Sequence, residues 1–326
     1  MKRVLWVAVA LCLLLVIEVF IGIAMGPVKL EFHRLVSTIL GHGDAVATML
    51  IWDLRLPRVA AALLVGACLG IAGYLLQTST RNPLGDPLLF GLGGGSAVIQ
   101  ALAMAGIVGM GTWGLYSLSV VASLVGAAII TFFASRQGVS PARLALIGVS
   151  LSALTAAIAT GALAGARVFS VQSLNFIGGS LANRGWQDIL PALPFFGLGL
   201  LVVIPVLGNL NVLALGDQVA GNLGAEPGRT RAVAVASSGI LGGTAVAIAG
   251  MVGFVGLLVP HVTRLLVGHD VRSAFIISIL LGASVVLFAD QVARLAFMPS
   301  EVPIGMITAL LGAPLMIFVA RRIQWN

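Results

Sequence analysis

Charged side chains are scarce in this sequence. Only 9% of its 326 residues are Asp, Glu, Lys or Arg, against about 25% in an ordinary soluble domain. Hydrophobic residues make up 59% of the chain, and its mean hydropathy is +1.11. No single core could hide that much apolar surface, because folded domains leave a large fraction of their surface exposed. The shortage of charge excludes an ordinary soluble protein and predicts a chain that is surrounded mostly by lipid.

Cysteine is almost absent, and so are the motifs of nucleotide hydrolysis. The only two cysteines, Cys12 and Cys68, lie in apolar runs, where thiols are usually inert. They predict neither a disulfide nor a metal site, and nothing indicates a cofactor. The sequence has no GxxxxGK[ST] motif and no visible group of nucleophile, base and acid. These absences exclude an ATPase and argue against an enzyme of any kind.

Apolar runs long enough, or nearly long enough, to cross a bilayer are abundant, since a span needs about 20 residues. We predict an all-α polytopic membrane protein with about ten transmembrane helices that form a single transmembrane domain over residues 1–326. The first run is expected to be an uncleaved span, because it is longer than the apolar part of a typical signal peptide and contains Glu18. The runs cover residues 4–25, 57–77, 88–109, 115–134, 143–164, 189–207, 231–250, 252–267, 273–296 and 304–320.

The net charge of +7 does not indicate nucleic acid, because the basic residues stand singly between apolar runs. Ten spans place both termini on one side, and eleven of the 18 Lys and Arg residues then fall on that side. By the positive-inside rule this side is the cytoplasm. Trp6 and Trp325 fall at the cytoplasmic edge of the membrane. The eleven residues are Lys2, Arg3, Arg81, Arg136, Arg143, Arg229, Arg231, Arg264, Arg272, Arg321 and Arg322.

Two glycine-rich or polar segments allow more than one interpretation. The cluster GLGGGSA (91–97) could cradle a phosphate, but it lacks the preceding strand and the following lysine, which favours close helix packing. The inner segment 208–230 alternates apolar and polar residues at helical spacing and contains Gly224 and Pro227. It predicts a short amphipathic helix that docks a soluble partner. A helix on the membrane surface is the alternative, but the segment lacks the basic face that such helices prefer.

Five motifs, in order, resemble one family over nearly the full chain. They are RLPR (55–58), NPLGDPLLFGLGGGSA (82–97), LALGDQVAGNLG (213–224), GFVGLLVPHVTRLLVGHDVR (253–272) and PIGMITALLGAPLMIFVARR (303–322). They resemble the FecCD/BtuC-type permease subunits of bacterial ABC importers for iron chelates and vitamin B12. The resemblance implies a type II importer fold with ten spans, both termini in the cytoplasm and a location in the bacterial inner membrane.

The resemblance also implies partners. An ABC ATPase subunit, in two copies, is expected to bind the inner segment, with a periplasmic substrate-binding protein outside and a second permease copy beside this one. Residues 213–224 of the inner segment match the part of the family that couples to the ATPase, and we call them the coupling segment. Leu215, Ala220 and Leu223 are expected to contact the ATPase, and Asp217 could cap the helix or pair across the interface. The coupling segment is assigned Leu213, Leu215, Gly216, Asp217, Ala220, Leu223 and Gly224.

On the outer side, Arg55, Arg58 and Arg294 match positions at which similar permeases receive acidic residues of the binding protein. The arginine fork suits bidentate contact with a carboxylate. Two other interpretations stand beside this one. The arginines could reach toward outer headgroups, or Asp53 or Asp290 could neutralise one of them within the chain.

Structural roles are expected for Asn82, Pro83, Pro260, His261 and Arg264, which belong to the matching motifs. Pro260 is expected to kink its helix. Arg264 is expected to reach toward inner headgroups or the last carbonyls of its helix. His261 could ligate haem iron, but a packed imidazole is the favoured interpretation, since the family carries this Pro-His pair across different substrates.

The fifth span, 143–164, lines the translocation path in the family. Ser150, Ser152, Thr155 and Thr160 are its polar residues, although their hydroxyls could instead bond their own helix. Ser140, Pro141 and Ala142 fall where the family places an inner gate. Some relatives have small hydroxyl residues at the positions of Pro141 and Ala142, so this sequence leaves the chemistry of the gate open.

The expected function is import of an iron chelate, siderophore or haem, powered by a separate ATPase. Cobalamin import is the alternative. A secondary transporter would need intramembrane carboxylates in its path, and Glu18 and Asp290 are the candidates. A channel would need polar rings that line a pore, and no segment supplies a clear one.

Overall fold

In the computed structural model the chain is described over residues 2–135, 140–166, 171–298 and 300–320. All regular elements in these ranges are helices, which confirms the predicted all-α fold. The first half contains α1 (Lys2–Ala24), α2 (Phe32–Ile39), α3 (Ala45–Thr48), the π-helical η1 (Met49–Arg55), α4 (Leu56–Thr80), α5 (Gly94–Met104), α6 (Thr112–Ala134) and α7 (Pro141–Gly165). The second half contains α8 (Val171–Gly178), α9 (Trp186–Ile189), α10 (Ala192–Val203), the 3-10 turn η2 (Ile204–Val206), α11 (Leu207–Leu213), α12 (Asp217–Asn222), α13 (Pro227–Ala249), α14 (Val255–Val267), α15 (Val271–Leu295) and α16 (Ile304–Ala320).

All ten predicted apolar runs contain a helix. Among the described residues, seven helical segments are long and apolar enough to cross a membrane: Lys2–Ala24, Ala45–Thr80, Thr112–Ala134, Ala142–Gly165, Trp186–Leu213, Pro227–Ala249 and Val271–Leu295. Three shorter apolar helices occupy the other runs: Gly94–Met104, Val255–Val267 and Ile304–Ile317. About ten helices is therefore the right number, although three of them are shorter than the bilayer is thick.

Two segments differ from their predicted form. The run 88–109 becomes a helix only from Gly94, because residues 88–93 form turns in which Gly91 has a φ of +71°. Residues 26–56 are largely helical, since α2, α3 and η1 lie there and η1 continues directly into α4. We expect an outer loop for residues 26–56 from the sequence, because they lie between two apolar runs and are rich in polar residues, but short helices carry many of these residues.

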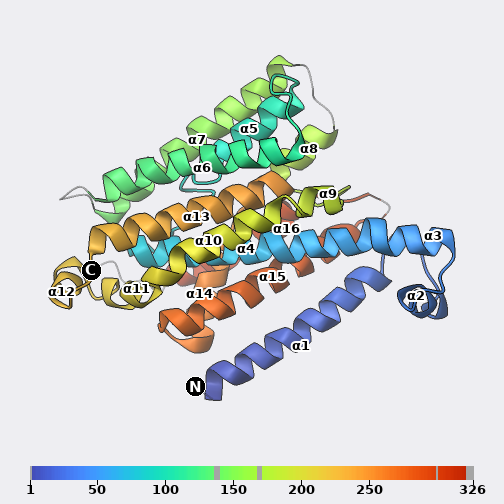
Figure 1. The fold of residues 1–326 in the computed structure, drawn as a ribbon, viewed down its shortest axis with the longest axis horizontal. Helices are drawn as coiled ribbons and strands as arrows, with labels where there is room; N and C mark the ends of the chain where they lie inside the picture. Colours follow the sequence, from blue (N-terminus) through green and yellow to red (C-terminus); the bar gives the residue numbers. More distant parts are fainter. Residues whose placement is uncertain (1, 136–139, 167–170, 299, 321–326) are drawn as a thin grey trace.

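Helix α4 is the centre of the fold. It packs mainly on α13, α14 and α15, and it runs through the middle of the bundle in Figure 1. Small residues make this position possible, because they let helix backbones approach closely. Gly66 faces the backbone of Gly282 on α15, and Gly73 faces the backbone of Gly256 on α14. Twenty residues of α4 are buried, including Tyr74 and Gln77.

Helices α5, α6 and α7 form a separate layer along one edge of the bundle (Figure 1), joined to the rest chiefly through α13. The glycine cluster 91–97 lies in this layer. A Cβ on Gly94 would meet Thr155 of α7, and one on Gly95 would meet the backbone of Ala122 on α6. The cluster therefore serves close helix packing, as predicted.

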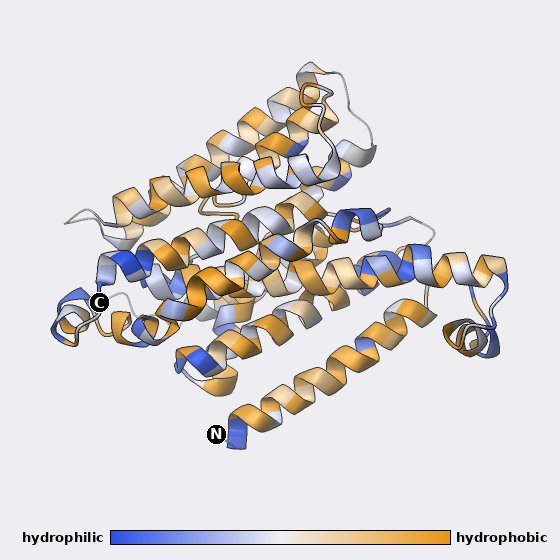
Figure 2. Ribbon diagram, viewed as in Figure 1, coloured by the Kyte–Doolittle hydropathy of each residue, from blue (hydrophilic) through white to orange (hydrophobic). Residues whose placement is uncertain are grey.

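Hydrophilic residues gather at the two ends of the bundle, and the lengths of the helices between them are apolar (Figure 2). One end carries α12 and the start of α1, and the opposite end carries α2, α3 and α9 (Figure 1). We call them the α12 end and the α9 end. Trp52 and Trp186 meet at the α9 end, where the indole nitrogen of Trp186 donates to the Trp52 carbonyl at 3.0 Å. Arg136, Arg321, Arg322 and Trp325 lie outside the described residues.

Candidate functional site

The role of Pro260 is explained by one hydrogen bond. A proline cannot donate to the carbonyl four residues before it, which leaves the Gly256 oxygen without its helical partner. The Nε2 of Gln77 on α4 donates to that oxygen at 3.1 Å, and the Oε1 of Gln77 accepts from Arg264 at 2.7 Å. The Arg264 guanidinium also lies 5.8 Å from the centre of the Tyr74 ring. Pro260 and Arg264 therefore join α14 to α4, and Arg264 does not reach the end of its own helix as expected.

The backbone leaves helical geometry before Pro260, at the start of α14, and the kink at Pro260 stays a prediction. Gly250 and Phe254 have φ values of +74° and +68°, and α14 begins at Val255 without a side-chain cap from Phe254. The buried carboxylate of Asp86, from the segment between α4 and α5, bonds the backbone of Gly256 and Leu257. Asp86 thus caps α14 from a distant part of the chain. His261 is half-buried on α14, and its packing role stays a prediction.

Asn82 and Pro83 form the turn that follows α4. Arg81 ends the helix in the left-handed region with a φ of 51°. The Oδ1 of Asn82 then accepts from the Leu84 nitrogen at 2.9 Å, and the Asn82 carbonyl accepts from Gly85 at 3.0 Å. These contacts make an Asx turn, which shapes the chain where it leaves α4.

The coupling segment, residues 213–224, is held in place by one carboxylate. Asp217 begins α12, and its Oδ1 accepts from Arg81 at 2.7 Å and from Arg231 at 2.9 Å. The side chain of Arg231 is only 8% exposed, and its Nε donates to the Ser79 carbonyl. Asp217 therefore pairs within the subunit, and it links α12 to the end of α4 and the start of α13.

Exposure divides the coupling segment into two sets of apolar residues. Leu213 and Ala220 are fully buried within the subunit, so the expectation that Ala220 contacts the ATPase is corrected. Leu215 and Leu223 are each 65% exposed, and Val219 is 43% exposed. Gly216 and Gly224, with φ values of +114° and +80°, form the turns on either side of α12. The result is a short helix, fixed on its buried side, with exposed apolar side chains on it and at both of its ends.

A second connection at the α12 end ties α11 to the turn between α14 and α15. Asn211 Oδ1 accepts from the Val271 nitrogen at 2.9 Å, and Asn211 Nδ2 donates to Asp270 at 3.4 Å. Asp270 caps α15 by accepting from both the nitrogen and the hydroxyl of Ser273. These hydrogen bonds from Ser273 hold the pKa of Asp270 below its ordinary value. These bonds join α11 to the start of α15.

The three arginines assigned to the outer surface make internal contacts at the α9 end. Arg55 donates to the carbonyls of residues 23, 24 and 28, and Arg294 donates to the Gly22 carbonyl at 3.0 Å. Arg58 pairs with Asp290 and with Glu301, at 2.9 Å in each case. The interpretation in which Asp290 neutralises an arginine within the chain thus describes Arg58. The geometry favours structural roles for all three, and a docking role stays a prediction.

Replacing Asp290 with alanine should destabilise the protein. Asp290 is 1% exposed and Arg58 is 12% exposed, so the change leaves a buried guanidinium that keeps Glu301 as its one carboxylate partner among the described residues. Removing one member of a buried pair typically costs 3–5 kcal/mol, and we expect about 3 kcal/mol here because Glu301 remains. Chemical denaturation in detergent measures the loss. The matched control is D53A, which removes the exposed Asp53. Equal stability of both variants would show that Arg58 does not depend on Asp290.

On α7, most of the predicted path residues bond their own helix. The hydroxyl of Thr155 donates to the carbonyls of Leu151 and Ser152 at 3.0 Å, and those of Ser150 and Thr160 donate one turn back. Ser152 is half-buried. This arrangement matches the alternative in which these hydroxyls serve the helix, and it leaves their role in the path a prediction.

The assigned gate lies at the start of α7. Ser140 is the N-cap of the helix and accepts from the Arg143 nitrogen at 3.3 Å. Pro141 is its first residue, a position at which the missing N–H costs nothing, and Ala142 is exposed. The Pro141 side chain and residues 138–139 lie outside what the structure describes. Ser140 and Pro141 together account for the start of the helix, and the gate stays a prediction.

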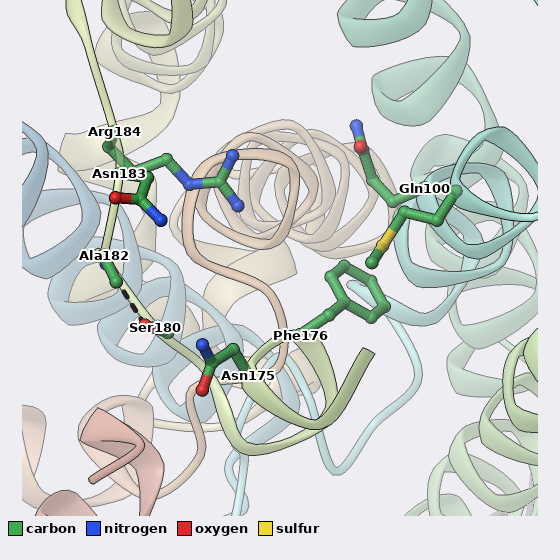
Figure 3. Close-up of a pocket in the computed structure, with 8 residues that line it drawn as sticks. Gln100, Asn175, Phe176, Ser180, Ala182, Asn183 and Arg184 are labelled. Atoms are coloured by element: carbon green, nitrogen blue, oxygen red, sulfur yellow. Dashed lines mark hydrogen bonds between the residues drawn. The ribbon is translucent and has the colours of Figure 1, made fainter. Parts of the chain in front are cut away.

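Sequence reasoning missed a polar cavity of about 280 Å³ at the α9 end. Figure 3 shows Gln100 of α5, Asn175 of α8, and Asn183 and Arg184 from the segment before α9 around it. The only signal in the sequence was the polar content of residues 165–188. The residues come from three separate segments, so no local pattern could reveal that they meet.

Among the described residues no cluster of three or more His, Cys, Asp or Glu side chains could hold a metal ion. Glu18 accepts from Ser284 at 2.9 Å, and Asp290 is held by Arg58. Both candidate carboxylates, Glu18 and Asp290, therefore make contacts between helices, and neither lines the polar cavity. This arrangement does not supply the carboxylate path of a coupled secondary transporter.

Comparison with known proteins identifies the fold and the family. The chain is 36% identical over 316 residues to the iron(3+)-hydroxamate import system permease protein FhuB of Bacillus subtilis, covering 96% of this chain and 82% of that one. It is 35% identical over 284 residues to the vitamin B12 import system permease protein BtuC of Yersinia enterocolitica, covering 85% and 83%.

A solved structure described as a metal-chelate type ABC transporter in an inward-facing conformation has the same fold. It superposes with a TM-score of 0.78 and 32% identity, and covers 97% of this chain and 99% of that one. The model of the FecCD transport family matches residues 14–322. This match spans every helix described above except the start of α1, and the chain belongs to the FecCD transport family.

Proposed function

We propose that this chain is the permease subunit of an ABC importer that carries an iron chelate inward across the bacterial inner membrane. The observation that carries the proposal is the coupling segment. Leu215, Val219 and Leu223 stay exposed at the α12 end, on and directly beside a short helix that Asp217 fixes to two long helices. Exposed apolar side chains on a fixed base mark a docking site for another protein.

The partner that fits the coupling segment is an ABC ATPase. The chain has no nucleotide-binding motif of its own, and its relatives are named as permease components of import systems. ATP hydrolysis then occurs in a separate subunit, present in two copies. Asp217 links the docking site to α4 and α13, so a displacement of α12 by the ATPase is transmitted to these two helices.

A second copy of the permease is the other membrane partner. The outer edge of α7 presents exposed small residues at every fourth position: Ala153, Ala157, Gly161 and Gly165. A Cβ on either glycine would meet nothing within 4 Å. Such small-residue faces pack against a second helix. We assign this face to the contact between two copies, with the substrate path between them.

The α12 end is assigned to the cytoplasm and the α9 end to the outside, where a periplasmic binding protein delivers the substrate. The start of α1 lies at the α12 end (Figure 1), together with Arg81, Arg143, Arg229, Arg231 and Arg272. The positive-inside rule places these cations in the cytoplasm. Both termini then lie inside.

The substrate class is tested by uptake into cells that lack their own copy of this gene. Cells that express the chain and its partners are given radioactive iron as ferric citrate, a ferric hydroxamate or haem, or radioactive cobalamin. We expect energy-dependent uptake of an iron chelate and none of cobalamin. Cobalamin is the second candidate because a vitamin B12 permease is among the relatives. Uptake of cobalamin without iron would replace the iron proposal.

A further inference from the structure

The polar cavity at the α9 end has the size and chemistry of a small-ligand site. Its volume is about 280 Å³, close to the lower limit of about 300 Å³ for small-molecule sites. Five of its eight lining residues are polar: Gln100, Asn175, Ser180, Asn183 and Arg184. In a chain that is 59% hydrophobic, such a concentration of amide and guanidinium groups is unusual.

The guanidinium of Arg184 is incompletely satisfied. Its Nη1 lies 3.5 Å from Asp188, at the outer limit of a hydrogen bond. The Oδ2 of Asp188 accepts from the Gly185 nitrogen at 2.9 Å, so this carboxylate is shared. The Nε of Arg184 is buried and has no partner among the described residues. Figure 3 shows the side chain reaching into the cavity toward Gln100.

The backbone that carries these groups is anchored from two sides. The Ser180 nitrogen donates to Ala249 at 2.8 Å, and the Met251 nitrogen donates to Phe176 at 3.0 Å, which fixes the segment to the end of α13. The Ile304 nitrogen donates to Gly179 at 2.8 Å at the start of α16.

Asn183 lies in the left-handed region with a φ of 59°, a conformation that asparagine adopts more readily than most residues other than glycine. It stands directly before Arg184, on the anchored segment. The polar groups are therefore held in position before a ligand arrives.

We propose that this cavity is a recognition site for an anionic, oxygen-rich iron chelate, with Arg184 as the charged contact and Asn175, Asn183 and Gln100 as neutral donors. The inference rests on the proposed function, because it specifies which iron chelates the permease accepts. Arginine binds carboxylate oxygens through its planar fork, and amide side chains bond further chelate oxygens. A cationic chelate would meet the guanidinium as a like charge.

The test measures binding of two ferric chelates of opposite charge to the chain, assembled with its ATPase subunits in lipid nanodiscs. The probes are ferric citrate, which is anionic, and a cationic ferric trihydroxamate, each labelled with radioactive iron. R184Q removes the cation. N175D adds an anion to the same cavity with almost no change of shape. The matched control is R34Q, which makes the same charge change at the exposed Arg34 on α2.

We expect R184Q and N175D each to weaken ferric citrate binding about tenfold or more, since a charge-assisted contact is worth roughly tenfold to hundredfold in Kd. Binding of the cationic chelate should change less than about twofold or become tighter. R34Q should change neither. R184Q and N175D test the same prediction independently. If one variant folds poorly, the other still tests the inference.

Equal weakening of both chelates, no weakening of ferric citrate, or the same weakening by R34Q would overturn the inference. If R184Q leaves chelate binding unchanged but weakens association of the binding protein, Arg184 pairs with a carboxylate of that protein. This result also overturns the inference. ATP-driven import of the two probes by the wild-type complex separates this failure from a failure of the proposed function. If an iron chelate is imported but R184Q does not discriminate between the two charges of chelate, only the recognition site is rejected. If no iron chelate, haem included, is imported, both the recognition site and the proposed function are rejected.

Discussion

Replacing Gly66 with alanine is expected to lower the free energy of unfolding by roughly 3 kcal/mol, at the upper end of the usual cost of overpacking. A Cβ at Gly66 would collide with the carbonyl oxygen of Gly282, and a Cβ at Gly282 would collide with the carbonyl oxygen of Gly66. Both obstacles are backbone atoms in the middle of long helices, so no side-chain rotation can relieve the collision. The variant can fold only if α4 and α15 move apart.

Separation of these helices would affect most of the core, because α4 packs chiefly on α15 and α13. Thermal unfolding of the purified protein in detergent, together with the yield of monodisperse protein, measures the effect. The control is G197A on α10, where an added Cβ meets nothing within 4 Å and where alanine favours the helix. Wild-type stability of G66A would mean that α4 and α15 do not approach as closely as described.

The second large effect is expected at the coupling segment. The double variant L215D/L223D should abolish stable association with the ATPase and, with it, ATP-driven transport. Each leucine is 65% exposed, and burial of a leucine side chain in an interface contributes roughly 1.5–3 kcal/mol. A carboxylate in its place would enter the interface without a partner, which adds a desolvation cost. A loss of at least a hundredfold in affinity follows.

Folding should be unaffected, because Leu213 and Ala220 hold the inner side of the segment and both remain. Co-purification of the ATPase with the tagged permease measures association. The control Q218D/N222D places the same two charges on α12 at exposed polar positions. Recovery of the ATPase at wild-type stoichiometry with L215D/L223D would refute the docking assignment. Equal loss with the control would indicate that charge, and not apolar contact, governs the interface.

The membrane-spanning architecture was predictable because lipid imposes a simple rule. A span must be apolar and about 20 residues long, and this rule located all ten runs from composition alone. It failed where the chain interrupts a helix inside the bundle. Residues 88–93 are as apolar as a span, yet they form turns, because Asp86 and the close contacts of Gly93 and Gly94 fix them there.

The roles of the charged residues were much less predictable, since their partners are distant in sequence. Arg58 meets Asp290 across 232 residues, and Arg264 meets Gln77 across 187. A single sequence shows that an arginine lies at a helix end, but not whether a carboxylate from another helix is there to receive it. The sequence alone therefore cannot distinguish an arginine that reaches toward lipid headgroups from one that binds a partner protein or one that pairs within the chain.

The structure of the coupling segment was more predictable than the roles of the charged residues and less predictable than the spans. Its amphipathic pattern predicted a short helix, which α12 confirms, because helical periodicity is a local property. Which apolar side chains stay exposed depended on how the helix rests on α11 and α13. Leu215 and Leu223 are exposed while Ala220 is buried, and Asp217 ties this part of the chain to Arg81 and Arg231.

ATP-driven uptake of an iron chelate into sealed vesicles tests the central claim most directly. The purified chain is reconstituted with its ATPase partner, with ATP and the chelate-loaded binding protein placed on opposite sides of the membrane. The account predicts accumulation of radioactive iron only when ATP is on the side of the α12 end and the binding protein on the side of the α9 end. It also predicts no accumulation with L215D/L223D. Accumulation without the ATPase, or undiminished accumulation with that variant, would contradict it.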